Sequence, residues 1–182
     1  FENKDGNFRS VRRLESDDLL NWDDELIVLE PDSIDRALYP TPTKQPPVDY
    51  YGATVFKYPN ANGMYIMLAQ AFWHWFDLPN TEKLGPNTFD VRFASSRDGK
   101  KFTRLNRSPF LKLGPAGSFY SKMIWAMPHP IQMGDELWFY FSGTNKDHTG
   151  QVDAGAQKLK SGIGRAVLRL DGFVSLDTDY NS

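Results

Sequence analysis

One short pattern occurs twice in this sequence, and its spacing restricts the architectures that the chain can adopt. Residues 11–22, VRRLESDDLLNW, match residues 91–102, VRFASSRDGKKF, at an offset of 80 residues. The shared positions hold Val, Arg, Ser and Asp, and an aromatic residue closes each copy. Recurrence at a fixed interval is typical of folds built from repeated supersecondary units. We therefore expect the same local structure at both places.

A third copy of the pattern, GRAVLRLDGF, occupies residues 164–173. It aligns with the second copy at an offset of 73 residues, because 171 − 98 = 73. A period of 73 to 80 residues leaves room for four strands and long connections in each unit. The aligned pairs at the offset of 73 are Arg92 with Arg165, Tyr65 with Trp138 and Asp98 with Asp171.

Between the copies, short apolar runs alternate with clusters of Gly, Pro, Asn and Asp, and long helical patterns are nearly absent. Such runs are typical of β-strands. The stretch 31–49, PDSIDRALYPTPTKQPPVD, is rich in Pro and polar residues, and we expect a loop or an extended connection there. The expected strands cover residues 8–14, 25–30, 51–58, 64–75, 88–95, 102–105, 122–133, 134–143 and 162–170.

These runs predict an all-β fold in which antiparallel four-stranded sheets stack as the blades of a β-propeller. The outer strands of one blade fall within about residues 1–30, a second blade within about 49–105 and a third within about 119–177. The chain 1–182 is then one partial propeller domain, and the repeated pattern is the hairpin between the third and fourth strands of a blade.

The repeated pattern also predicts the details of its turn. The Ser and Asp side chains of each copy are expected to bond backbone groups of the turn. Gly99 and Gly172 are expected to adopt a positive φ. The closing aromatic residues, which are expected to pack between blades, are Trp22, Phe102 and Phe173.

Composition excludes several classes of function. The formal net charge of −2 gives no electrostatic reason to expect nucleic acid or an anionic membrane as partner. No apolar run approaches the ~18 residues of a membrane span. The absence of cysteine excludes disulfides and thiolate metal sites, the three histidines show no zinc spacing, and we expect no metal and no cofactor. The composition fits cytoplasm, periplasm and secretion, and we favour a periplasmic or secreted location.

The segment SDDLLNW resembles the Ser-x-Asp-Leu-x-x-Trp motif of the five-bladed β-propeller glycoside hydrolases of families 32 and 43 and their uncharacterised relatives. SRDGKKF is the same motif with Gly in the turn. Three longer runs resemble the later blades of one branch of this group. They are VDYYGATVFKYPNANGMYIML, GSFYSKMIWAMPHPIQMGDELWFYFSG and GIGRAVLRLDGFVSLD.

The resemblance implies hydrolysis of glycosidic bonds by general acid/base catalysis, with an oligosaccharide or glycoside as substrate. It also implies that the chain, which opens at Phe1 without an initiator Met, holds the later blades of a propeller. About two further blades would then lie upstream in the same polypeptide. In the family the catalytic carboxylates come mainly from the first three blades, so most of them are expected outside this sequence.

The expected innermost strand of the second blade begins at VDYYGATVF, and the resemblance places an acidic residue at this mouth. Asp49 is therefore our catalytic candidate, as a base, as a modulator of a neighbouring pKa or as an acceptor for a sugar hydroxyl. The alternative is that Asp49 only caps the turn after Pro47. Tyr50, beside it, is expected to contact the substrate.

Five further residues are candidates for sugar contact. The mouth of the third blade carries Tyr120 and Lys122 where relatives hold an acidic residue, so a second carboxylate from this blade is in doubt. His74 and Trp75 end a strand in the aromatic run FWHWFD, which suits stacking on a sugar ring, and His148 ends the equivalent strand of the next blade. Packing between blades is the alternative role for the aromatic residues and the histidines.

Two other classes of function stay open at this point. A non-catalytic carbohydrate-binding propeller would share the aromatic contacts and lack one of the two catalytic carboxyl groups. An interaction propeller without a sugar site would leave His74, Trp75 and His148 buried or scattered. The sequence does not distinguish the sugar, the linkage, the stereochemistry or the oligomeric state.

Overall fold

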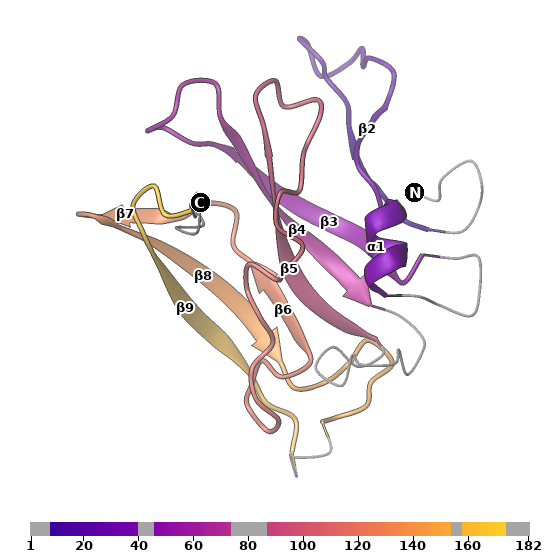
Figure 1. Ribbon diagram of the computed structural model, residues 1–182, viewed down its shortest axis with the longest axis vertical. Helices are drawn as coiled ribbons and strands as arrows, with labels where there is room; N and C mark the ends of the chain where they lie inside the picture. Colours follow the sequence, from indigo (N-terminus) through magenta and orange to yellow (C-terminus); the bar gives the residue numbers. More distant parts are fainter. Residues whose placement is uncertain (1–7, 40–45, 74–86, 154–157, 174–182) are drawn as a thin grey trace, which may run out of the picture.

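The computed structural model describes residues 8–39, 46–73, 87–153 and 158–173, and these residues are predominantly β (Figure 1). The all-β prediction is confirmed at this level. The strands are β1 (Val11–Arg13), β2 (Leu26–Leu29), β3 (Val48–Lys57), β4 (Tyr65–Trp73), β5 (Thr88–Ser96), β6 (Met123–Ala126), β7 (Ile131–Met133), β8 (Glu136–Thr144) and β9 (Ser161–Arg169), with one helix, α1 (Ser33–Leu38).

The strands form two sheets. β1 and β2 make an antiparallel hairpin, and the other seven strands form a sheet with the order β3-β4-β5-β6-β8-β7, in which β9 pairs with β8. The larger sheet consists of two antiparallel units, β3–β5 (the first unit) and β6–β9 (the second unit). One parallel pairing, between Phe89 and Met123, joins the units at a single point. Within the described residues the strands do not close into a ring, so the blade interpretation stays a prediction.

Each face of the first unit is covered by a different neighbour, because its strands bury apolar side chains on both sides. One face, with Ile66 and Leu68, packs against Phe139 of the second unit. The other face, with Met67 and Ala94, packs against Val28 of the β1–β2 hairpin. Strands buried on both faces read as nearly continuous apolar runs, which explains the long run around β4. Each fully buried aliphatic side chain contributes about 1.5–3 kcal/mol of transfer free energy.

The hydrogen bonds of the predicted turn are confirmed in the first two copies, but Trp22, which was expected to pack between blades, is 54% exposed. The Ser96 hydroxyl accepts from the backbone N–H of Gly99 at 2.9 Å, and the Asp98 carboxylate accepts from those of Lys100 and Lys101 at 2.8 and 3.0 Å. The equivalent residues 16–21 repeat these bonds at 2.7–2.8 Å. The residue after the Asp has a positive φ in both copies, 64° at Leu19 and 68° at Gly99.

The third copy departs from the prediction by one residue. The positive φ falls on Asp171 (58°), and the structure does not give Gly172 one, so Asp171 takes the place of Gly99 at an offset of 72. The strand register agrees, because the pair Tyr65–Ser96 becomes Leu137–Leu168 at the same offset. The predicted alignment of Asp98 with Asp171, of Tyr65 with Trp138 and of Arg92 with Arg165 was therefore wrong. The Asp171 carboxylate instead accepts a bond from the Tyr58 hydroxyl.

The connection 31–49 was predicted as a loop or extended segment, and that was wrong for residues 33–38, which form α1. The Asp32 carboxylate accepts from the N–H groups of Ile34 and Asp35, and the Asp35 carboxylate accepts from the Asp32 N–H at 3.0 Å. This capping box satisfies the free N–H groups at the start of the helix. Asp32 and Asp35, three residues apart after Pro31, were the local signal in the sequence that the prediction missed.

Three expected strands also differ in extent. The run 102–105 is reduced to a single bridge between Thr103 and Ser95. The run 122–133 is divided into β6 and β7, which both pair with β8, since the Pro residues at 128 and 130 interrupt it. The run 8–14 retains only the three residues of β1.

Candidate functional site

Strand ends from both units meet at one edge of the larger sheet. Asp49, at the start of β3, is paired with Phe72 at the end of β4, and β5 begins beside them. Phe89 pairs with Met123 at the start of β6, and Met123 pairs with Thr144 at the end of β8. These strand ends therefore lie at a common edge of the sheet (Figure 1).

A group of six residues gathers at this edge, and we call it the strand-end cluster. Its only described carboxylate is Asp49, which is 2% exposed and accepts from the backbone N–H and the guanidinium of Arg9 at 2.9 and 3.0 Å. The Arg9 guanidinium also lies over the ring of Tyr51 at 4.6 Å and is 44% exposed. The members of the cluster are Arg9, Asp49, Tyr51, Phe72, Phe89 and His148.

The aromatic part of the strand-end cluster combines both units. The Tyr51 ring makes edge contacts with Phe72 at 4.9 Å, Phe89 at 5.1 Å and His148 at 5.5 Å between centroids. The backbone N–H of His148, in the loop after β8, donates to the Asn87 carbonyl at 3.0 Å. This bond holds the loop of the second unit against the start of β5, which brings an exposed imidazole to the aromatic residues of the first unit.

The electrostatics of the strand-end cluster favour a neutral Tyr51 hydroxyl. Two bonds from Arg9 stabilise the charged form of the Asp49 carboxylate. Burial raises the pKa of the Tyr51 hydroxyl. The nearby Arg9 charge opposes this increase, and the Asp49 charge adds to it. The hydroxyl therefore stays protonated at neutral pH and can both donate and accept a hydrogen bond.

Tyr50 is placed on the opposite side of β3. It is 2% exposed, and its hydroxyl accepts a bond from the guanidinium of Arg104. Burial raises the pKa of this hydroxyl well above its ordinary value. The structure thus separates Tyr50 from Asp49 and brings Tyr51 to the strand-end cluster, as the alternation of side chains along a strand requires.

The remaining residues predicted to contact the substrate have different outcomes. Lys122 lies at the same edge, because its backbone bonds to Thr144 at 3.1 Å and to Phe89 at 3.0 Å. Tyr120 packs against Phe141 at 5.5 Å between ring centroids. The predicted residues that lie outside the described part of the chain are His74 and Trp75.

Sequence reasoning missed the aromatic members of the strand-end cluster and Arg9. Tyr51 could have been found from Asp49, because residues two apart on a strand share a face. Phe72 and Phe89 required the pairing of β4 with β3 and β5, and no local signal pointed to Arg9.

Two further buried carboxylates near this edge accept bonds from backbone N–H groups. Asp147 is 6% exposed and accepts from the N–H groups of Thr149 and Gln151, both at 2.9 Å. Asp153 accepts from the N–H of Gly117 at 2.8 Å. These bonds order the loop that carries His148.

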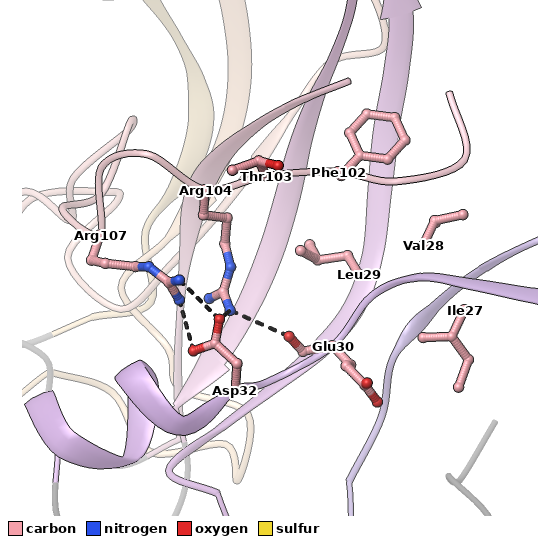
Figure 2. Close-up of a pocket in the computed structure, with 9 residues that line it drawn as sticks. All are labelled: Ile27, Val28, Leu29, Glu30, Asp32, Phe102, Thr103, Arg104 and Arg107. Atoms are coloured by element: carbon pink, nitrogen blue, oxygen red, sulfur yellow. Dashed lines mark hydrogen bonds and ion pairs between the residues drawn. The ribbon is translucent and has the colours of Figure 1, made fainter. Parts of the chain in front are cut away.

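A cavity of about 280 Å³ lies elsewhere, between β2 and the segment after β5 (Figure 2). Arg104 makes a bidentate pair with Asp35 at 2.8 and 2.9 Å, and Arg107 makes one with Asp32 at 2.9 and 2.8 Å. Partial burial opposes ionisation of Asp32, but Arg107 and Arg104 hold its pKa below the ordinary value. The charges in this cavity are paired with one another, so the arrangement fixes α1 to the sheet.

The described residues contain no group of three or more His, Asp or Glu side chains arranged to hold a metal ion. Among the same residues, no helix has the length and apolar character needed to cross a bilayer. The chemistry available in the strand-end cluster is thus that of a carboxylate, a guanidinium, a phenol and an imidazole around an aromatic surface.

Comparison with known proteins gives the fold more support than the function. No protein-family model matches the chain. No curated protein matches it either. A solved structure of an N-acetylgalactosamine deacetylase from F. plautii, in complex with blood group B trisaccharide, is similar at a TM-score of 0.56 with 18% identity over 88% of this chain. The chain spans 41% of the length of that protein, and at this identity the likeness shows a shared fold.

Proposed function

We propose that this chain forms consecutive blades of a five-bladed propeller and binds a saccharide at the strand-end cluster. The observation that carries the proposal is the convergence of Tyr51, His148 and the Asp49–Arg9 pair at one edge. Sugars are recognised by aromatic faces together with a few charged hydrogen-bonding groups, which this cluster offers. An interaction protein without a ligand site would not require an exposed imidazole to contact a Tyr from another unit.

We propose further that the protein cleaves glycosidic bonds, with Asp49 as one of the two carboxyl groups. The ionised Asp49 suits a base or an acceptor for a sugar hydroxyl, since Arg9 stabilises its negative charge. The proton donor to the leaving oxygen must then be a second carboxyl group, and its separation from Asp49 decides whether the reaction retains or inverts configuration. The similarity in fold to a protein solved with a trisaccharide supports a carbohydrate ligand.

A second candidate, sugar binding without hydrolysis, is favoured by one observation. The other described carboxylates at this end of the sheet are already bonded. Asp147 accepts from backbone N–H groups of its own turn, Asp153 accepts from the Gly117 N–H, and the fully buried Asp90 is paired with Arg92. If no acid from another part of the polypeptide faces Asp49, the strand-end cluster binds a saccharide and leaves its linkage intact.

The test is a panel of aryl glycosides, N-acetylated glycosides and plant or algal oligosaccharides, read for reducing ends, for acetate and for binding. We expect Asp49→Asn to lower the rate of glycoside cleavage by about 10²–10⁴-fold, as for loss of a general base. Asp24→Asn, an exposed carboxylate on the β1–β2 hairpin, should keep the wild-type rate. Release of acetate without cleavage would replace the proposed reaction, and binding without either product would favour the second candidate.

Binding is tested separately from catalysis. Tyr51→Ala and His148→Ala should each weaken the sugar affinity by about tenfold, since each removes a contact worth about 1.4 kcal/mol. The matched control is His129→Ala, an exposed histidine in the turn between β6 and β7. Equal affinities of all three variants and the wild type would contradict a saccharide site at the strand-end cluster.

A further inference from the structure

Lysine residues surround the end of β8, beside the strand-end cluster. The backbone N–H of Lys122 donates to the Thr144 carbonyl at 3.1 Å, and the N–H of Asn145 donates to the Lys160 carbonyl at 3.1 Å. The four lysines in the segments around the end of β8 are Lys122, Lys146, Lys158 and Lys160.

A buried amide fixes two of these lysines in position. Asn145 is fully buried, its side-chain oxygen accepts from the Lys160 N–H at 2.7 Å, and its side-chain nitrogen donates to the Lys158 carbonyl at 2.8 Å. The segment before β9 is thereby held against the end of β8. The backbone positions of Lys158 and Lys160 at this edge are therefore set by the fold.

The acidic groups near the lysines are turned away from solvent. Asp147 and Asp153 are 6% and 9% exposed. Asp147 accepts backbone bonds inside the loop that carries His148, and Asp153 accepts from the N–H of Gly117, in the loop before β6. By contrast, Lys146, Lys158 and Lys160 are exposed, although the Lys160 ammonium donates to the Gly117 carbonyl at 2.9 Å. Among the described residues, the solvent-facing charge of this edge is therefore positive.

We propose that the strand-end cluster selects saccharides that carry an acidic group, either a uronate carboxylate or a sulfate ester. This inference rests on the proposed function and adds the substrate class. Tyr51 and His148 contact the sugar ring, while Lys122 and Lys160 attract the anionic substituent as point charges. A neutral sugar gains the ring contacts alone and binds more weakly.

The experiment compares three trisaccharides by calorimetry at low and at physiological salt. The probes are trigalacturonic acid, its fully methyl-esterified form, which has the same ring skeleton without the charge, and a sulfated galactotriose. We expect either anionic probe to bind about tenfold more tightly than the ester at low salt, with the advantage reduced by added salt. The comparison of the two anionic probes distinguishes a carboxylate from a sulfate ligand.

The variants are Lys122→Gln, Lys160→Gln and the control Lys57→Gln, an exposed lysine at the far end of β3. The first two should weaken binding of the anionic probe by about threefold or more and leave the ester unchanged, and Lys57→Gln should change neither. Equal affinity for acid and ester, or an equal effect of Lys57→Gln, would overturn the inference. If the ester binds and Tyr51→Ala abolishes that binding, the proposed function survives this failure; if no probe binds, both proposals fail.

Discussion

At the scale of single residues, Asp18 and Asp98 organise the two equivalent turns through backbone bonds. Bonds from the N–H groups of Lys101 and Lys100 lower the pKa of Asp98 to about 2 from an ordinary value of 3.8. The bonds that Asn21 and Leu20 donate lower the pKa of Asp18 well below the same ordinary value of 3.8. Both carboxylates are solvent-exposed, so hydrogen bonding is the cause of these shifts rather than a buried ion pair.

The sign of the resulting pH dependence follows from the depressed pKa values. A carboxylate with a lower pKa in the folded state stabilises that state above pH ~4 and loses this contribution as the pH falls toward ~2. We expect Asp18→Asn/Asp98→Asn to flatten the decrease in the free energy of unfolding over this range, measured by urea denaturation at a series of pH values. Asp24→Asn should retain the wild-type slope. If the free energy of unfolding of the double variant decreases at low pH as steeply as that of the wild type, these two turns do not contribute to the acid sensitivity.

At the scale of secondary-structure elements, α1 is fixed to the sheet by a buried ionic cluster. Arg104 is 5% exposed and bonds Asp35 of α1, the Glu30 carbonyl at 3.3 Å and the Tyr50 hydroxyl of β3. A six-residue helix is too short to be stable alone, so this cluster holds it. Its position over the start of β3 links the β1–β2 hairpin to the strand that carries Asp49 (Figure 1).

Breaking this cluster from one side should be costly. Asp35→Asn removes the bidentate partner of the buried Arg104 guanidinium and leaves it only Asp32, at 3.0 Å, so we expect the free energy of unfolding to fall by about 1.5–3 kcal/mol. The measurement is urea unfolding, with Ser33→Ala, an exposed position on the same helix, as the control. The double variant Asp35→Leu/Arg104→Met should recover much of the loss, because it removes both charges. An Asp35→Asn variant as stable as Ser33→Ala would contradict the conclusion that the ionic cluster holds α1 on the sheet.

At the scale of the whole molecule, the β1–β2 hairpin packs on one face of the first unit, and the second unit packs on the other face (Figure 1). At the offset of 72, Trp138 of the second unit corresponds to Ile66 of the first, whose face is covered by the second unit. The corresponding face of the second unit is open, with Ile163 69% and Val167 48% exposed on β9. Val167 lies directly across from Trp138, so the open face is continuous between β8 and β9.

Exposed apolar side chains on an open sheet face favour self-association, although this face also carries Arg165, whose guanidinium lies 3.9 Å from the centre of the Trp138 ring. We expect the chain 1–182, studied alone, to form dimers or larger species in sedimentation velocity experiments. Ile163→Lys/Val167→Lys should shift the distribution toward the monomer, and Ile34→Lys, at an equally exposed position on α1, should not. A monodisperse wild-type monomer would contradict this expectation and would also weaken the blade interpretation.

Local chemistry was predictable from the sequence, and long-range chemistry was not. The Ser-x-Asp turns and most strand positions follow from residue types and their spacing, because their bonds connect neighbours in the chain. The one-residue error in the third copy arose because Asp-Gly was matched by identity, whereas strand register decides which residue turns. Arg9 and Arg104 were missed since their partners lie 40 and 69 residues away along the chain.

By itself, the sequence determined that the chain repeats a β-hairpin, that its strands are buried on one or both faces, and that Asp49 begins a strand. The tertiary structure alone decided that Tyr51 rather than Tyr50 accompanies Asp49, and that His148 of the second unit contacts the first. The physical reason is that turn bonds and side-chain alternation depend on a few adjacent residues. The strand-end cluster depends on how two units pack, and that is decided by the burial of apolar faces over the whole chain.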